Sequence, residues 1–559
     1  MSEIDWLVLC STLLFIIIYG VYKNRHHKDI KDYLKGGNKS SWFTVGISVM
    51  ATQASAITFL STPGQAYFEG MGFIQFYFGL PLAMIIICVF FLPIYQKLKV
   101  YTAYEFLENR FNLKTRILTA SLFLIQRGLA AGITIYAPAI ILSVILGWNL
   151  KIMVIIIGLL VIFYTLIGGT HAVSLTQKQQ MFVIFLGMTV AFIYLNESLP
   201  EKINFSRALD IAGLNGKLNL IDFSVDPKSR YTIWSGLTGG LFLALSYFGT
   251  DQSQVQRYLS GKSLLESQKG LIMNGFLKIP MQFFILLTGV MVFVFFQFEK
   301  APIHFNPKAT ELITKSEFKT DFQKLENENF ELHIKKLNFL NREDFFENET
   351  QRKDYLLLQK KEKQNRIKAK ALIEKALPSV ESNDKDYVFI FYILKYLPTG
   401  LIGLLIAVIL SAAMSSTASE LNALATTSLI DFYKRGFPNL SQKHYVNVAK
   451  AFVLFWGLIA ISFAAVGNLF ENLIEYVNII GSIFYGTVLG VFLTAFFIKY
   501  VNGKAVFIGA IISQTIVFSI YYLDIVGYLW LNLIGAILTI ILSILLEFLS
   551  SKNPVKTED

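Results

Sequence analysis

The chain has 559 residues, of which 54% are hydrophobic and 16% are charged, and its mean hydropathy is +0.52. A soluble protein of this length would carry more charge, and many apolar runs reach the ~18 residues that cross a bilayer, so we predict an all-α membrane protein. The two cysteines, Cys10 and Cys88, lie in apolar runs and exclude both a disulfide framework and a cysteine-rich metal cluster.

Hydropathy predicts about thirteen transmembrane helices. The first of them, DWLVLCSTLLFIIIYGVY, lacks the basic start and the small-residue cleavage site of a signal peptide, so we expect a retained helix. The predicted spans are 5–22, 42–67, 71–96, 116–146, 152–169, 179–196, 232–254, 269–298, 397–430, 447–468, 473–499, 504–523 and 526–549.

The distribution of positive charge predicts the orientation of the chain. With the N-terminus outside, and counting a few residues into the helix ends, the inside segments carry 23 Lys and Arg, whereas the outside segments other than 299–386 carry six. Positive residues favour the cytoplasmic side, which predicts an N-out, C-in protein of the plasma (inner) membrane. The net charge of +11 then reflects the inner membrane surface, so the lipid bilayer is an expected partner and nucleic acid is not. The sequence leaves the oligomeric state open.

Segment 299–386 differs from the rest of the chain because it is water-soluble in character. It contains 18 Lys and Arg and 17 Asp and Glu, and its pattern predicts helices of mixed charge. Long loops cross a membrane largely regardless of charge, so we expect an extracytoplasmic helical insertion, with a lid or a partner-docking role as the alternative. The insertion separates the first eight transmembrane helices (1–298) from the last five (387–549), which precede a cytoplasmic tail (550–559).

The second predicted span, GISVMATQASAITFLSTPGQAYFEGM, is unusually polar for membrane depth. Polar and Pro- or Gly-bearing interruptions are tolerated inside a bilayer only where they are buried or line a cavity. We therefore expect a helix that is unwound at its centre and exposes backbone carbonyls; the alternative is close helix packing through small residues. The residues concerned are Thr52, Gln53, Ser55, Thr58, Ser61, Thr62 and the pair Pro63-Gly64.

The seventh predicted span has a matching interruption. In SGLTGGLFLALSYFGTDQSQVQRYLSGKS, the Gly-Gly pair at 239–240 and the sequence GTDQ at 249–252 interrupt the apolar run. Paired interruptions at corresponding places in two halves are typical of transporters built from inverted repeats. We predict two repeats of five spans, the first over 42–196 and the second starting at residue 232.

A run of hydroxyl residues, ILSAAMSSTASELNAL, lies in the ninth predicted span. Ala412, Ser415 and Ser416 are spaced i, i+3, i+4 and share one helix face. Their oxygens, with the carbonyls exposed in the second span, would form an oxygen-only cavity with no carboxylate on that face. Such a cavity favours a monovalent cation over calcium; the alternative is that the serines bond back to the preceding turn.

Arg127 lies in the fourth predicted span, within FLIQRGLAAGITIYAPAIIL. An intramembrane arginine usually faces the protein interior, pairs with another group and marks a transport pathway. Arg127 could therefore receive a substrate carboxylate or another anion, and snorkelling of its side chain to the membrane interface is the alternative.

Three segments carry a resemblance to a known family. They are YTLIGGTHAVSLTQKQQ (164–180), with a Gly-Gly turn before the sixth helix, TDQSQVQRYLSGKSLLESQKG (250–270), with a Gln-Arg loop, and SAAMSSTASELNALATTSLIDFYKR. Each resembles the corresponding segment of the sodium–solute symporters, which share the fold of the bacterial leucine transporter. ASAITFLSTPGQAYFEG and IYAPAIIL are closer to the branch that carries monocarboxylates, iodide and vitamins than to the sugar branch. The resemblance implies a leucine-transporter-like 5+5 inverted-repeat fold over nearly the whole chain outside 299–386.

The resemblance also implies a symporter rather than an enzyme, with a sodium ion carried together with a small solute. Family members bind sodium through two carbonyls of the broken helix and through one carbonyl and two hydroxyls of the ninth span. These positions are Ala51, Ala54, Ala412, Ser415 and Ser416 in this chain. We expect the solute at mid-membrane over the inner-gate tyrosine, near Gln53, Thr58, Gln75, Arg127 and Tyr247.

Some positions depart from the family pattern. Gln177 stands where members with a second sodium site carry Asp, which argues against a second sodium ion. Two positions that contact sugars in the sugar branch are the aliphatic Ala244 and Ile474 here, and such side chains cannot bond a sugar hydroxyl. A sodium-coupled sugar or polyol carrier is therefore the alternative substrate prediction, and a solute sensor and a channel are the alternatives of other classes.

Overall fold

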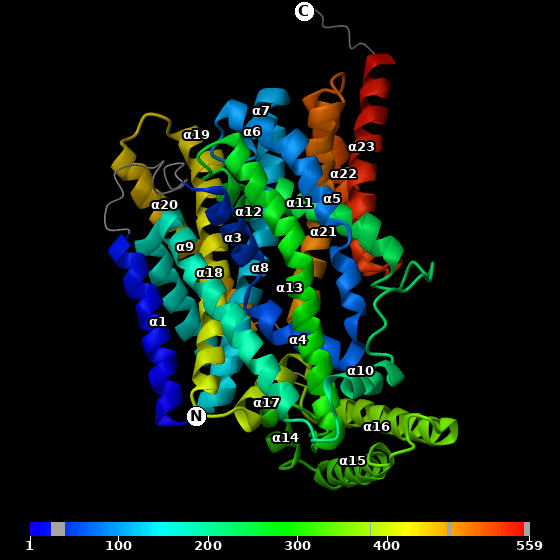
Figure 1. Cartoon of the computed structure of the whole chain (residues 1–559). Helices are drawn as coiled ribbons and strands as arrows, with labels where there is room; N and C mark the ends of the chain where they lie inside the picture. Colours follow the sequence, from blue (N-terminus) through cyan, green and yellow to red (C-terminus); the bar gives the residue numbers. More distant parts are fainter. Residues whose placement is uncertain (24–39, 379, 381, 467–471, 553–559) are drawn as a thin grey trace, which may run out of the picture.

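The computed structural model describes residues 1–23, 40–378, 380, 382–466 and 472–552, and these fold into a bundle of helices (Figure 1). Within the described part, nine helices are long and apolar enough to cross a membrane, and one bent pair would make a tenth. The predicted all-α membrane fold is confirmed. The total of thirteen spans and the N-out topology stay predictions.

The first half of the chain forms helices whose ends follow from the local sequence. Asn112 caps the helix that starts at Leu113 by accepting a hydrogen bond from the amide of Thr115 at 2.9 Å, and Gly147, with a φ of +67°, ends it. The elements are α1 (Glu3–Lys23), α3 (Trp42–Gln53), α4 (Ala56–Glu69), η2 (Met71–Tyr77), α5 (Leu80–Ile86), η3 (Ile87–Phe91), α6 (Leu92–Leu98), α7 (Glu105–Arg110), α8 (Leu113–Leu146), α9 (Leu150–Glu197) and α10 (Phe205–Leu214).

The second half contains the second predicted interruption. Thr250 and Asp251 separate two short helices, and a π-helical turn precedes them and ends at Gly239, so the seventh span is broken as predicted. The elements are η4 (Ser235–Gly239), α11 (Gly240–Gly249), α12 (Gln252–Tyr258), α13 (Leu264–Phe298), α14 (Pro307–Ile313), α15 (Lys319–Leu340), α16 (Glu349–Ala376), η5 (Lys385–Tyr387), α17 (Val388–Tyr396), α18 (Leu401–Thr427), η6 (Ser428–Tyr433), α19 (Lys434–Gly436), α20 (Gln442–Val466), α21 (Leu473–Phe497), α22 (Gly503–Tyr522) and α23 (Tyr528–Lys552).

The spans predicted at 152–169 and 179–196 are not separate helices. Both lie in α9, a single helix of 48 residues. The turn expected at the Gly-Gly pair 168–169 was therefore wrong, because the backbone continues as a helix across it. A glycine inside a helix costs only about 1 kcal/mol relative to alanine, and the long apolar stretches on both sides favour continuation.

Helix α18 has a central position in the bundle. It contacts α3, α4, α8, α9 and α12, and most of its side chains are buried. Helix α13 packs along both α3 and α4. Where α13 meets α4, Gly289 touches the backbone of Pro63 and leaves no room for a side chain. The two short helices of the second span are thus held between α13 and α18.

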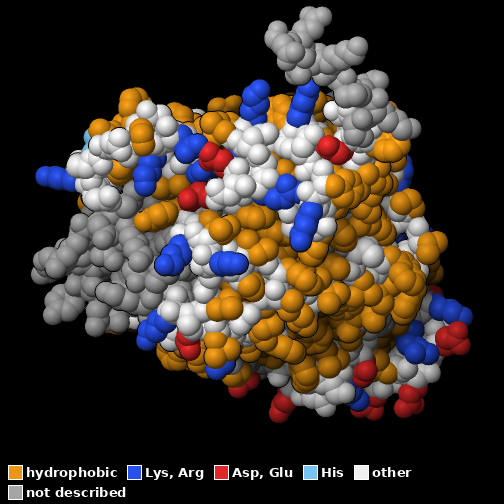
Figure 2. Space-filling model, turned by 90° about the horizontal axis from the view of Figure 1, so that it is seen from above, with side chains coloured by type: hydrophobic (Ala, Val, Ile, Leu, Met, Phe, Trp, Pro, Cys, Tyr) orange, Lys and Arg blue, Asp and Glu red, His pale blue; other side chains and the backbone are white. Residues whose placement is uncertain are grey.

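The two ends of the bundle differ. The start of α1 and the insertion helices α14 to α16 lie at one end, whereas α7, α19 and the last turns of α23 lie at the other (Figure 1). Figure 2 looks onto that second end and shows Lys and Arg side chains spread across it. The insertion is anchored to the bundle at the first end, where the buried Lys336 donates a hydrogen bond to Gln297 of α13 at 2.9 Å.

Candidate functional site

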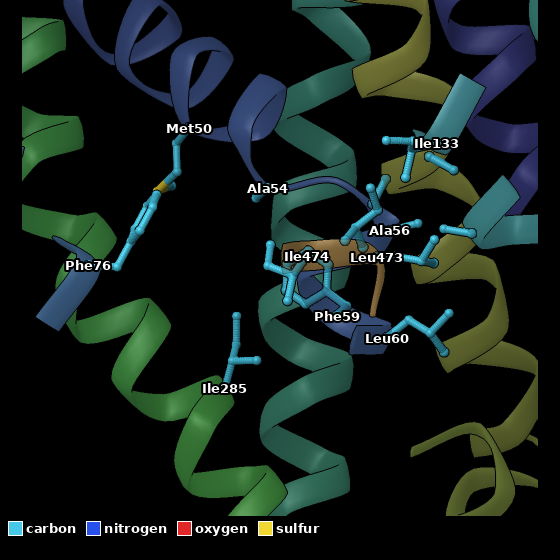
Figure 3. Close-up of a cluster of buried hydrophobic side chains, with 14 of the residues drawn as sticks. Met50, Ala54, Ala56, Phe59, Leu60, Phe76, Ile133, Ile285, Leu473 and Ile474 are labelled. Atoms are coloured by element: carbon cyan, nitrogen blue, oxygen red, sulfur yellow. The ribbon is translucent and has the colours of Figure 1, made fainter. Parts of the chain in front are cut away.

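The second span is broken where it faces the centre of the bundle. Helix α3 ends at Gln53 and α4 starts at Ala56, and the two helices are bent by 58°. Figure 3 shows Ala54 at this break, among apolar side chains from the surrounding helices. The prediction of an unwound span is confirmed, but the pair Pro63-Gly64 lies inside α4 and does not make the break. The helix continues past the proline, where Gly289 of α13 packs directly against the Pro63 backbone.

Two backbone carbonyls lose their usual helical partners at the break. In an unbroken helix, the amides of Ser55 and Thr58 would bond to the carbonyls of Ala51 and Ala54. Here the amide of Ser55 donates to the carbonyl of Gln53 at 3.1 Å, and that of Thr58 donates to the carbonyl of Ser55 at 3.0 Å. Ala51 and Ala54, which the sequence assigns to sodium, are 3% and 1% exposed. Buried carbonyls that the break frees in this way are suited to a cation.

Helix α18 carries the other three predicted sodium ligands. Ser415 Oγ is buried and has no hydrogen-bond partner within the described residues. Ser416 Oγ donates to the carbonyls of Ala412 at 3.0 Å and Ala413 at 3.2 Å, which is the back-bonding that the sequence left as the alternative. Because its hydrogen points to the backbone, the oxygen lone pairs of Ser416 stay available to a cation. Both α3 and α4 contact α18, so the break and these serines lie on neighbouring elements.

Gln177 of α9 joins three helices next to the break. Its Nε2 donates to Thr52 Oγ1 at 3.2 Å and to Ser419 Oγ at 3.3 Å, and its Oε1 accepts from Ser48 Oγ at 2.5 Å. These contacts connect α3, α9 and α18 through a neutral amide. The amide N–H of Gln177 therefore occupies the hydroxyl oxygens of Thr52 and Ser419, which a second sodium ion at this place would need as ligands. That the protein binds a single sodium ion stays a prediction.

We expect Gln177→Leu to lower the stability of the protein by about 1–3 kcal/mol, because it removes three buried hydrogen bonds that connect α3, α9 and α18. The thermal unfolding of purified protein in detergent measures the change. Gln180→Leu is the matched control, since Gln180 is a buried amide on the same helix whose side-chain N and O have no partner in the described part of the chain. An equal loss in both variants would contradict a bridging role for Gln177.

Arg127 lies in a buried cluster of charges. Its guanidinium pairs with Asp251 and, at 3.0 Å, with Glu420, and it donates to Tyr485 Oη at 2.7 Å. Arg127 is 3% exposed, so the expected pairing in the interior is confirmed and snorkelling is not seen. Glu420 follows Ser416 by four residues on α18, so the expectation that this face carries no carboxylate was wrong. Glu420 shares Arg127 with Asp251, so the ion pair compensates that charge only in part.

Three of the predicted solute residues lie towards the centre of the bundle. The ring of Tyr247 has the guanidinium of Arg127 5.4 Å from its centroid, and its hydroxyl accepts a hydrogen bond from Gln254 at 2.6 Å. Gln53 and Thr58 flank the break, and the buried Gln53 Oε1 has no partner among the described residues. These positions leave polar groups of the broken span available to a solute.

Gln75 is bound elsewhere. Its Oε1 accepts from the amide of Asp222 at 2.9 Å, and its Nε2 donates to the carbonyls of Gly72 at 3.1 Å and Tyr231 at 3.0 Å. Both of its donor hydrogens are used, so Gln75 fixes the loop that precedes η4.

The sequence interpretation did not assign Asp251, Glu420 or Tyr485 to the site. Asp251 was noted only as part of an interruption, and Glu420 lies inside the hydroxyl run. Both are ionisable residues in predicted spans, which is the same signal that identified Arg127. That signal marks both as candidate partners of the arginine, but it does not show that they pair with it.

The chain is similar in sequence to known sodium-coupled transporters. The sequence profile of the sodium:solute symporter family matches residues 33–319 and 370–513. The chain is 27% identical over 521 residues to the mouse sodium-coupled monocarboxylate transporter 2, which covers 92% of this chain and 71% of that protein. It is 30% identical over 274 residues to the human sodium/iodide cotransporter, covering 48% of this chain and 41% of that protein.

A solved structure has the same fold. It is the substrate-bound outward-open state of a Na⁺-coupled sialic acid symporter, with a TM-score of 0.75, 24% sequence identity and coverage of 98% of both chains. The fold that the sequence resemblance implied is confirmed by this likeness.

Proposed function

Because the chain belongs to the sodium:solute symporter family, we propose that it imports a small anion, such as a monocarboxylate, across the plasma membrane. Membership of the family makes the chain a multi-pass membrane protein that carries a small solute together with sodium, and not an enzyme. The similarity to a monocarboxylate transporter and to an iodide cotransporter supports an anion over a sugar. The buried apolar Ala244 and Ile474 support the same choice, because neither can bond a sugar hydroxyl.

The proposed sodium site combines the break with α18. The freed carbonyls of Ala51 and Ala54 provide two ligands, and Ala412, Ser415 and Ser416 provide the other three. The observation that carries this site is that the amides of Ser55 and Thr58 are bonded to carbonyls other than those of Ala51 and Ala54. Five neutral oxygens suit a monovalent hard cation that must leave again. In the described residues, no group of three or more His, Cys, Asp or Glu side chains offers a competing metal site.

The proposed mechanism couples sodium to solute through the broken helix. Sodium connects α3 and α4 to α18, which stabilises the state that is open to the outside and fixes the end of α3 where Gln53 lies. The solute then binds near Gln53, Thr58 and Tyr247, and one group of helices moves against the other to release both inside. By linkage, sodium and solute each raise the affinity of the other by the same factor.

Arg127 has an indirect role in this proposal. Its guanidinium is already paired with two protein carboxylates, so a solute carboxylate would have to compete with them. Arg127 instead packs against the ring of Tyr247. Through its ion pairs with Asp251 and Glu420 it also connects α8 with α18 and with the break in the seventh span. Gln75 supports the loop before η4 in the same indirect way.

Uptake into proteoliposomes tests the proposed function. We expect propionate and iodide, but not mannitol, to accumulate above equilibrium when a sodium gradient is present, and accumulation to stop when choline replaces sodium. Downhill flux without accumulation would indicate a channel, and binding without flux would indicate a sensor. Sodium-driven uptake of mannitol in place of the anions would contradict the substrate class.

A further inference from the structure

A cavity of about 290 Å³ lies between the insertion and the end of α4. One wall is formed by Tyr67 to Glu69 of α4, and the facing wall is formed by α16, between Gln359 and Lys370. Most of this α16 wall falls in residues 320–369, which lie outside both segments that match the family. One wall of the cavity is therefore built mostly by a part of this chain that the family profile does not describe.

Positive charge dominates the lining of the cavity. Five Lys or Arg and three Asp or Glu line it. The three acidic side chains are already engaged, since Glu69 pairs with Lys385, Glu362 pairs with Lys336, and Asp384 accepts from the amide of Phe305 at 2.8 Å. The remaining cations have no such compensation within the described residues. They are Lys217, Lys363 and Lys370.

Two of the cationic groups still have hydrogen-bonding capacity or charge that an anion could use. Lys217 Nζ donates to the carbonyl of Phe68 at 2.6 Å, and burial, together with the positive charge of Lys363, lowers the pKa of Lys217 to about 7. Arg366 pairs through Nε with Glu362 at 3.7 Å and donates through Nη1 to the carbonyl of Ile303 at 3.1 Å, whereas its Nη2 is buried and has no hydrogen-bond partner in the part of the chain described. A negative charge in the cavity would relieve the repulsion and accept from the unpaired guanidinium nitrogen.

We propose that this cavity is a second solute site, which binds a small carboxylate through Lys217, Lys363 and Arg366 before the anion moves along α4 to the break. A volume of about 290 Å³ is roughly ten times the ~30 Å³ that one water occupies in the liquid, so a carboxylate of a few carbons fits. The role in transport rests on the proposed import of an anion; binding in the cavity does not. The insertion thus supplies one wall of an anion-binding site at its end of the helix bundle.

Propionate is the probe for binding, and neutral propionamide is its control. Purified full-length protein is titrated in choline buffer of constant ionic strength, with chloride replaced by propionate, and thermal unfolding is measured. We expect propionate, and not propionamide, to raise the unfolding temperature, because only the anion binds the cationic groups of the folded protein. The shift should grow as the propionate concentration rises above its Kd. The double variant Lys363→Gln/Lys370→Gln should need at least fivefold more propionate for the same shift. Lys361→Gln/Lys368→Gln, which changes two exposed lysines of α16 that do not line the cavity, should match the wild type.

The two proposals fail differently. If wild-type protein shows no propionate-specific shift, or if both double variants change it equally, the cavity site is wrong. If sodium drives no carboxylate uptake while the Lys363→Gln/Lys370→Gln effect on binding is present, the cavity site stands and the proposed function fails. With both correct, Lys363→Gln/Lys370→Gln raises the half-saturating propionate concentration of uptake several-fold and leaves the maximal rate unchanged.

Discussion

Ser415→Ala is expected to raise the sodium concentration for half-maximal uptake by about tenfold to a hundredfold. Ser415 Oγ is buried and lacks a hydrogen-bond partner among the described residues, so its removal takes away a proposed sodium ligand and no protein hydrogen bond. A bond to a charged group contributes about 1.5–3 kcal/mol, and each 1.4 kcal/mol changes affinity about tenfold. Sodium titration of solute uptake by proteoliposomes measures the shift, and the rate at saturating sodium should change little.

Thr417→Val is the matched control for this prediction. Its hydroxyl is also buried without a partner in the described structure, but two residues further along α18 it points to the opposite side of the helix. We expect the sodium dependence of Thr417→Val to be unchanged. Ser416→Ala should shift it in the same direction as Ser415→Ala. Wild-type sodium dependence in Ser415→Ala would remove the α18 hydroxyls from the proposed sodium site.

The broken second span shows what the sequence could and could not predict. Its polar density predicts a break, because such residues are tolerated at membrane depth only where they serve a buried or open site. The position of the break did not follow from the Pro63-Gly64 signal, since α4 accommodates the proline against Gly289 of α13. The break lies at Ala54-Ser55, where packing against α13 and α18 decides which backbone bonds form. The same limit applies to the Gly-Gly pair at 168–169.

The charge cluster around Arg127 shows a second limit. Spacing along one helix is enough to place Ala412, Ser415 and Ser416 on one face, because 3.6-residue periodicity is a local property, and all three are buried. Arg127 is separated from Asp251 by 124 residues and from Glu420 by 293 residues, so no local pattern connects them. Pairing between distant helices depends on how the bundle packs, and only the structure supplies that. The cavity beside the insertion could not be predicted from the sequence for the same reason, because residues far apart in the chain line it.

Arg127→Gln is expected to destabilise the protein by about 3–5 kcal/mol, which is the usual cost of leaving a buried charge without its partner. The glutamine amide is neutral and shorter, so the carboxylates of Asp251 and Glu420 both lose their ion pair inside the bundle. Thermal unfolding of purified protein in detergent, and the yield of monodisperse protein, measure the effect. The stability of Arg127→Lys should lie between that of the wild type and that of Arg127→Gln, because an ammonium keeps the charge but cannot reach both carboxylates and Tyr485 at once.

The charge balance of the cluster provides the control. One arginine and two carboxylates leave one negative charge in excess, so Glu420→Gln alone should be tolerated, with Arg127 and Asp251 paired one to one. Adding Glu420→Gln to Arg127→Gln should recover part of the lost stability, because one carboxylate rather than two is then unpaired. A different result would assign Arg127 to the solute: wild-type stability in Arg127→Gln, with loss of propionate uptake and retention of uptake of a neutral solute. The two outcomes separate because a structural ion pair changes unfolding for every solute, whereas a solute receptor changes uptake only for anions.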